Sequence, residues 1–214
     1  MQTKKRIILG SASPRRRELL EQIGISFEVR VSDKEEVYHS LIPEEIVKEL
    51  ALSKAENVAD DLREKQEQVK QISFDKKNNV LLDTIVIGAD TIVVSDGSIL
   101  GKPKDEADAV RMIRSLQGRS HKVYTGVAIL DYDDEGKIKS VVHAVETEVF
   151  VNPMSDEEIR EYAATGEPLD KAGAYGIQGQ FAAYIERIDG DYYNVVGLPV
   201  SYVYRQLKEI AEKD

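Results

Sequence analysis

Three consecutive arginines, Arg15, Arg16 and Arg17, follow a serine-proline pair near the start of the chain. Ser13 is of a type that caps helices and Pro14 suits the first helical position, so we expect a helix to begin here. The helix dipole and the free backbone N–H groups disfavour cations in a first turn. A bound anion would remove that conflict. Arg15 and Arg16 therefore predict phosphate binding, with a solvated helix face as the alternative.

The helical register separates the three arginines. Arg15 and Arg16 precede two leucines by one turn, which places them on or near the side that faces the core. Arg17 precedes Glu21 by one turn on the polar face. For Arg17 the simpler interpretation is an exposed ion pair between residues four apart, worth a few tenths of a kcal/mol.

A carboxylate in an apolar run, Asp90, is the second candidate for chemistry. It lies between Val80 and Val94, a segment typical of a buried strand, with an interruption expected at residues 88–91. Burying an unpaired carboxylate would cost several kcal/mol or protonate it. We therefore expect Asp90 to pair with a cation or to face a cleft; the alternative is a turn aspartate that accepts bonds from nearby N–H groups.

Two lysines could provide that cation. Lys54 interrupts the apolar stripe of a helix that begins at Pro43, and it either extends its ammonium group to water or points it into a cleft. Lys102 follows Asp90 across a hairpin turn at residues 96–97, so these two side chains could meet.

A glycine-rich segment near residues 169–180 contains three glycines in seven residues, with Tyr175 among them. This composition predicts a loop whose backbone approaches another group closely. Gln178 lies on this loop, and its amide offers both a hydrogen-bond donor and an acceptor. Such an amide can pair with the carbonyl and the N–H of a uracil or thymine edge.

The composition limits the classes of function. The 214 residues, 42% hydrophobic, suffice for one α/β domain or at most two small lobes. A net charge of −10 argues against general binding of nucleic acid or of an anionic membrane. There is no cysteine, no signal-peptide core after residue 6 and no apolar run near the roughly 20 residues that span a bilayer, so a cytoplasmic location is expected.

Periodicity and turn residues predict the elements that must position these side chains. Helices are expected from Pro14, from Pro43, over about 105–116, from Ser155 to near Gly166, and after Pro199. Strands are expected at 7–9, 25–31, 80–94, 122–130, 139–151 and 181–188. The charged residues 60–79 predict a helical extension and a surface loop. His39, His121 and His143 share no metal-ligand spacing, and we assign them no chemistry.

Five segments in order resemble the Maf family of nucleotide pyrophosphatases, proteins once described as inhibitors of septum formation. The resemblance covers nearly the whole chain and rests on residues 11–20, 88–91, 101–103, 170–179 and 190–199. The charged segment at about 60–79 is longer than the family pattern. The resemblance implies a single domain over residues 1–214. It further implies an α/β fold with a mixed twisted sheet, helices on both sides and two lobes around a cleft, similar to inosine-triphosphate pyrophosphatase.

The resemblance also implies roles for individual residues. Asp90 matches the family's proton acceptor, and Glu35 matches an acidic position that helps to hold metal, whose ligands are otherwise unassigned. Three residues match positions that govern substrate choice: Arg15, Thr91 and Gln178. Five match the polar and basic lining that binds substrate: Ser11, Arg16, Lys54, Lys102 and Lys171.

The implied reaction is hydrolysis of a nucleoside triphosphate to the monophosphate and pyrophosphate with a divalent cation, Mg²⁺ or Mn²⁺. A triphosphate needs several cations and N–H donors, and attack by water needs a base. The glutamine predicts dTTP and UTP, including modified pyrimidine nucleotides, as substrates. The alternatives are a non-catalytic nucleotide-binding regulator of septum formation and a pyrophosphatase that prefers 7-methyl-GTP. A homodimer is also possible for this family.

Overall fold

The computed structural model describes residues 4–72 and 81–213, with the backbone alone from 66 to 72. Its frame is a mixed sheet of seven strands: β1 (Arg6–Leu9), β2 (Glu28–Val29), β3 (Thr84–Ser95), β4 (Ser98–Leu100), β5 (Ser120–Tyr132), β6 (Ile138–Val151) and β7 (Ile185–Asp189). The strand order is β2-β1-β3-β5-β6-β7, and β4 pairs with β3. β1 is parallel to both of its neighbours, whereas the other pairs are antiparallel.

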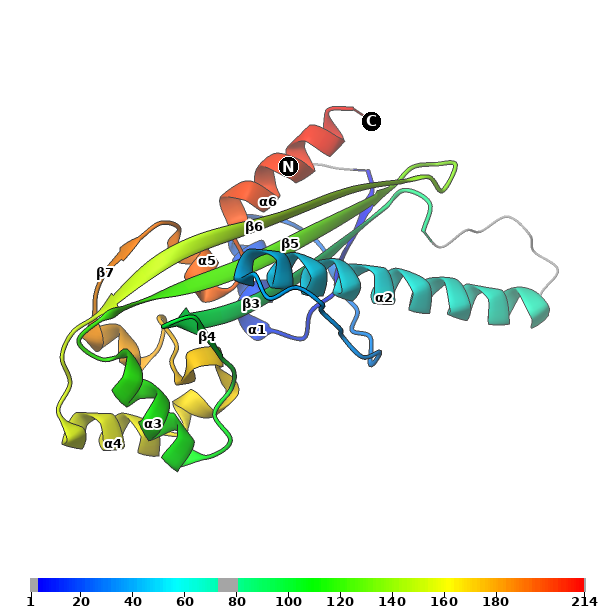
Figure 1. The fold of residues 1–214 in the computed structure, drawn as a ribbon. Coiled ribbons are helices and arrows are strands. Elements are labelled where there is room, and N and C mark those ends of the chain that lie inside the picture. The colour runs from blue at the N-terminus through cyan, green and yellow to red at the C-terminus, as the bar shows by residue number, and fades with distance from the viewer. Residues whose placement is uncertain (1–3, 73–80, 214) are drawn as a thin grey trace.

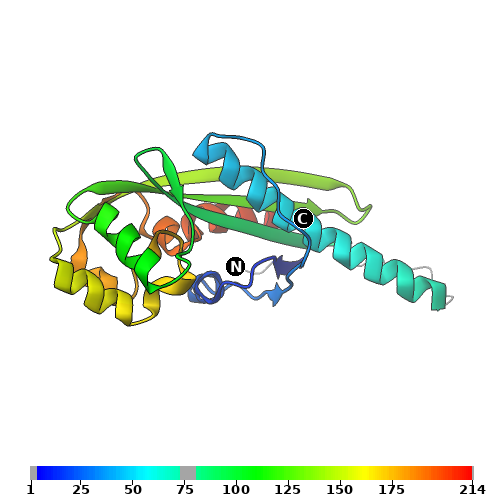
Figure 2. The same cartoon turned by 60° about the horizontal axis from the view of Figure 1, so that its bottom comes forward.

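Helices cover both faces of this sheet, as expected (Figures 1 and 2). They are α1 (Pro14–Gln22), α2 (Pro43–Ile72), α3 (Glu106–Leu116), α4 (Asp156–Ala164), α5 (Tyr192–Val196) and α6 (Val200–Ala211). Because side chains alternate along a strand, β3 and β5 supply apolar side chains to both faces of the sheet. Two smaller clusters pack against the apolar stripe of α2, and the largest cluster packs against the other helices. No helix of the described residues is long and apolar enough to cross a membrane.

Two glycines allow α2 to lie directly on the sheet. A Cβ added at Gly88 of β3 would overlap the carbonyl oxygen of Ala51, and one added at Gly126 of β5 would overlap that of Val47. Glycine inside a strand is typical of such close backbone approach. The interruption expected at residues 88–91 is therefore wrong: β3 runs unbroken through them.

α3 and α4 form a second group at one end of the long strands. Figure 1 shows α3 and α4 side by side there, away from the outer end of α2. Three short 3₁₀ segments connect α4 to β7: η1 (Glu167–Asp170), η2 (Ala172–Ala174) and η3 (Gln180–Tyr184). α4 begins with the capping box predicted at Ser155, and Gly166 adopts the left-handed conformation two residues after the helix ends. These two groups correspond to the two expected lobes.

Three predicted strands are shorter in the structure. The expected strand 80–94 begins at Thr84, because residues 81–83 form a turn. Only Glu28 and Val29 of the expected strand 25–31 pair, with Ile8 and Leu9 of β1. The expected strand 181–188 begins as the 3₁₀ segment η3, and strand pairing starts at Ile185. The helical extension predicted from residue 60 is present as far as Ile72, whereas residues 73–80 lie outside the described residues.

Candidate active site

A gap along one edge of β3 opens the candidate site. β1 pairs with β3 over Thr84–Ile87 and β4 pairs with it over Val93–Ser95. In the described structure, residues 88–92 between them pair only with β5. A cavity of about 420 Å³ lies here, bounded by the start of α1, by α2, by β3 and by the glycine-rich loop.

Successive residues of β3 face opposite sides of the sheet, so both faces contribute to this cavity. Asp90 points toward α2 and Thr91 toward α1, where each has a hydrogen-bond partner. The cavity lining contains all nine residues predicted to act as base, to bind substrate or to select it: Ser11, Arg15, Arg16, Lys54, Asp90, Thr91, Lys102, Lys171 and Gln178. The fold thus gathers residues that are up to 167 positions apart, from 11 to 178.

Lys54 joins two carboxylates at the α2 side of the cavity. Its Nζ lies 2.6 Å from Oδ1 of Asp90 and 3.1 Å from Oε2 of Glu36. The side chains of Lys54 and Asp90 are each less than a fifth exposed. Of the two readings of Lys54, the structure therefore shows the one in which the ammonium points into a cleft, and Asp90 is paired with a cation rather than placed in a turn.

Lys102 and Glu35 form no ion pair with Lys54 or Asp90 among the described residues. Lys102 lines the cavity and is exposed, but no ion pair joins it to Asp90 within the described residues. The sequence singles out Glu35 in the acidic loop before α2, whereas its neighbour Glu36 contacts Lys54. Glu35 is exposed and does not line the cavity. Two adjacent glutamates in an irregular loop offer no periodicity from which to choose between them.

Arg16 is buried and held by three protein acceptors. Its Nε donates to the carbonyl of Gly197 at 2.8 Å, one terminal nitrogen donates to Ser11 Oγ at 2.9 Å, and the other donates to Thr91 Oγ1 at 3.1 Å. Burial lowers the pKa of Arg16, and the charge of Asp90 opposes that effect. A guanidinium carries five N–H groups, so two remain for a ligand.

A directed chain of hydrogen bonds extends from Arg16 into the core. Thr125 Oγ1 lies 2.9 Å from the carbonyl oxygen of Asn194, which only accepts, so Thr125 uses its single proton there. Thr91 Oγ1, 2.9 Å from Thr125 Oγ1, must then donate to Thr125 while it accepts from Arg16. The Thr91 hydroxyl thereby uses its single proton within the protein. The sequence offers no signal for this role of Thr125 and Asn194, because their partners are distant along the chain.

The helical register predicted for the arginines is confirmed. Arg15 is half-buried and lines the cavity, Arg16 is buried, and Arg17 is exposed. Ser13 occupies the N-cap, but its side chain makes no capping bond, so α1 presents its first N–H groups to the cavity without that cap. The predicted ion pair between Arg17 and Glu21 is wrong, since none within 4.0 Å joins these two described side chains.

Contacts with residue 101, β3 and β5 hold the glycine-rich loop against the sheet. Gly173 N–H donates to the carbonyl of Gly101 at 3.0 Å, and a Cβ at Gly173 would press on Val93. Tyr175 is buried, and its hydroxyl lies 2.7 Å from His121 Nε2. Burial lowers the pKa of His121 to about 4, so this histidine is neutral and supports the loop. Gln178 is exposed at the cavity wall.

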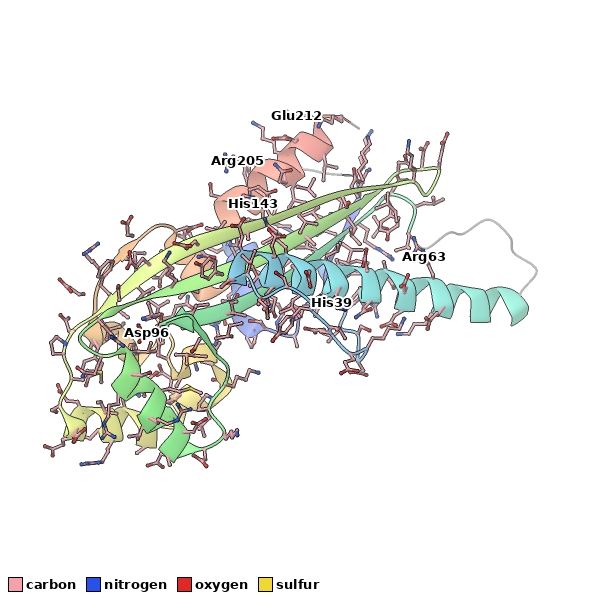
Figure 3. All side chains as sticks on the ribbon, in the orientation of Figure 1. His39, Arg63, Asp96, His143, Arg205 and Glu212 are labelled. Atoms are coloured by element: carbon pink, nitrogen blue, oxygen red, sulfur yellow. The ribbon has the colours of Figure 1, made fainter. Side chains whose placement is uncertain are left out.

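The other two histidines lie outside this pair. His39 contacts Glu49 of α2, and Figure 3 shows His143 on the sheet near α6. The ring of His143 stacks on Tyr202, with 4.2 Å between ring centroids. Within residues 4–72 and 81–213, no group of three or more histidine, aspartate or glutamate side chains is arranged to hold a metal ion.

Comparisons with known proteins show which family this chain is similar to. The dTTP/UTP pyrophosphatase of Agathobacter rectalis is 46% identical over 204 residues, which cover 95% of this chain and 97% of that protein. The dTTP/UTP pyrophosphatase of Dictyoglomus turgidum is 48% identical and covers 92% of each chain. A solved dITP/XTP pyrophosphatase of Mycobacterium abscessus aligns with 68% of this chain and 72% of its own, at a TM-score of 0.36 and 18% identity. The family model for Maf-like protein matches residues 6–210, and the chain belongs to the Maf family.

Proposed function

We propose that this protein hydrolyses nucleoside triphosphates, with dTTP and UTP preferred, to the nucleoside monophosphate and pyrophosphate. The observation that carries the proposal is the Asp90 carboxylate, 2.6 Å from Lys54 in a cavity that four further basic side chains line. A protein that only binds phosphates gains nothing from a carboxylate facing them. The names of the relatives agree with this reaction and with these substrates.

The basic groups of the cavity suit a triphosphate. Arg15, Lys102 and Lys171 come from three different segments, and the start of α1 adds backbone N–H groups. Arg16 contributes its two remaining N–H groups from a fixed position. Lys171 is partly neutralised, because its Nζ lies 2.7 Å from Oδ1 of Asp170. We therefore expect Arg15 and Lys102 to make the larger contributions to phosphate binding.

Asp90 is the proposed general base. A water molecule between its carboxylate and the α-phosphorus would give up a proton to Asp90 as its oxygen bonds to phosphorus, and the bond to pyrophosphate would break. Lys54 keeps the carboxylate oriented toward the cavity through their 2.6 Å contact.

The residues present fit a divalent cation. Carboxylate oxygens are preferred ligands of Mg²⁺, which is commonly held by one or two carboxylates, substrate phosphates and water. Glu36, which contacts Lys54 beside Asp90, would provide such an oxygen, with Glu35 as the position that the resemblance selects. When bound, the cation would neutralise charge on the phosphates.

Gln178 is proposed to read the base. Its side chain is exposed at the cavity wall, free to present donor and acceptor together to a uracil or thymine edge. Cytosine replaces one carbonyl with an amino group, and a site built around hydrogen bonds rejects such a mismatch strongly. A cytoplasmic location and a homodimer are further predictions of the sequence and the resemblance.

A pyrophosphate-release assay with dTTP, UTP, CTP and 7-methyl-GTP, each with Mg²⁺ or Mn²⁺, tests the proposal. We expect dTTP and UTP to give the highest kcat/KM. Highest activity on 7-methyl-GTP would contradict the pyrimidine preference alone. Nucleotide binding without release of pyrophosphate would contradict the enzyme and support a regulatory role.

A further inference from the structure

Glu167, which lies outside the cavity lining, connects α4 to the glycine-rich loop. Its carboxylate is half-buried and accepts two hydrogen bonds. The phenol of Tyr162 donates to Oε1 at 2.9 Å, and the backbone N–H of Gln180 donates to Oε2 at 3.0 Å. One bond reaches back to α4 and the other reaches forward past Gln178, so the carboxylate fixes the end of the loop relative to the helix.

Two glycines of the loop pack so closely against this carboxylate and the neighbouring lysine that no side chain would fit there without a shift of these groups. A Cβ at Gly179 would overlap the carboxylate of Glu167. A Cβ at Gly176 would lie 2.7 Å from Cε of Lys171. Lys171 in turn donates from Nζ to the backbone carbonyl of Glu167 at 2.7 Å. The close approach predicted from the glycine spacing is thus an approach to protein side chains beneath the loop.

Gln178 lies between these two glycines, and no hydrogen bond within the described structure restrains its side chain. The placement of its amide therefore depends on the backbone from residue 176 to 180. The Glu167 carboxylate contacts that backbone at Gly179 and accepts a hydrogen bond from Gln180.

We propose that Glu167 is a positioning residue that sets substrate selectivity through Gln178 without contacting the substrate. This rests on the proposed function, in which Gln178 reads the pyrimidine edge. Removing the carboxylate would free the loop, let the amide adopt several positions and weaken the distinction between uracil and cytosine more than turnover itself.

Two substitutions of Glu167 distinguish the effect of its hydrogen bonds from the effect of its negative charge. Glu167→Ala removes both acceptors, and we expect it to lower the ratio of kcat/KM for UTP over CTP at least about tenfold, mainly through a higher KM for UTP. Glu167→Gln should keep most of the ratio, because its amide can accept from Gln180 and donate to the Tyr162 oxygen. Glu161→Ala, an exposed truncation on α4, is the matched control and should leave the ratio unchanged.

A double-mutant cycle with Gly179→Ala tests the contact directly. Gly179 has φ −97°, which alanine adopts without strain, so the substitution should do harm only by overlapping Glu167. We expect Gly179→Ala alone to lower the melting temperature and the selectivity ratio. The double variant Glu167→Ala/Gly179→Ala should be no worse than Glu167→Ala.

Two results would overturn the inference: an unchanged ratio of kcat/KM for UTP over CTP in Glu167→Ala, whether or not both values fall, or additive effects of the two substitutions. A wild-type protein that hydrolyses neither dTTP nor UTP would contradict the proposed function instead. In that case the melting temperatures of the two single variants and the double variant still test the contact between Glu167 and Gly179.

Discussion

Replacing Thr125 with valine tests the hydrogen-bond chain that holds Arg16. Valine has nearly the shape of threonine but neither donates nor accepts. Thr125 is fully buried, so no solvent can replace its hydroxyl. The carbonyl of Asn194 and the proton of Thr91 would each lose their partner. Leaving a buried polar group unsatisfied costs about 1–3 kcal/mol. The Asn194 carbonyl takes this cost in full and the half-buried Thr91 hydroxyl takes about 1 kcal/mol, so the two together predict a loss of about 2–4 kcal/mol of unfolding free energy.

That loss should be visible in thermal unfolding. For a chain of this size, 1 kcal/mol lowers the melting temperature by about 2–4 °C, so Thr125→Val should melt about 5–15 °C below the wild type. Thr125→Ser is the matched control. It keeps the hydroxyl and loses one methyl group, worth about 1 kcal/mol. Activity should follow the same order, because Thr91 loses the bond that fixes its hydroxyl toward Arg16.

Calorimetry and UTP hydrolysis on the two variants therefore give a direct comparison. If Thr125→Val had the same melting temperature as Thr125→Ser and retained wild-type kcat/KM, the directed hydrogen-bond chain from Arg16 to Asn194 would be refuted.

Three further predictions concern the frame of the site. Gly126→Ala should displace α2 from the sheet, separating Lys54 from the strand, and lower both melting temperature and activity; unaltered melting would contradict the close approach seen at this glycine. Arg15→Ala should raise KM for UTP far more than Arg17→Ala, since only Arg15 lines the cavity, and equal effects would show that the register is wrong. The folded pKa of His121, about 4, lies below its unfolded value, so stability should fall as pH drops from 6.5 toward 4. Between pH 6.5 and 5 this amounts to on the order of 2 kcal/mol, and a His121→Gln variant whose stability fell as steeply as that of the wild type would contradict the assignment.

Local pattern alone is enough to predict the long elements of this fold. Alternation over 122–130 and 139–151 predicts β5 and β6 within two residues at each end, and helical spacing over 105–116 predicts α3 within one. The failures occur where tertiary contacts override local pattern. The apolar residues 181–184 adopt a 3₁₀ turn, and Gly88 marks the approach of a helix rather than a break in the strand.

Some residues of the candidate site can likewise be predicted from the sequence, and others cannot. Residue type and spacing single out Asp90, Arg15 and Lys54 as candidates, because a charge is unexpected in an apolar strand, and a cation is unexpected in the first turn of a helix or in its apolar stripe. Residues that act through other residues leave no such trace. Thr125 and Glu167 are ordinary in composition, and their importance follows only from the atoms that the fold brings to them.

The central claim is that Asp90 activates water for attack on a pyrimidine nucleoside triphosphate in this cavity. Its most direct test is steady-state release of pyrophosphate from UTP by the wild type and by Asp90→Asn, with binding of UTP measured for both by calorimetry. The account predicts that turnover falls at least about a hundredfold, at the lower end of general-base effects, while binding persists, because a negative charge facing the phosphates has been removed. Turnover near that of the wild type would contradict the account and transfer the role of base to another carboxylate, with Glu36, 3.1 Å from Lys54, the first to examine.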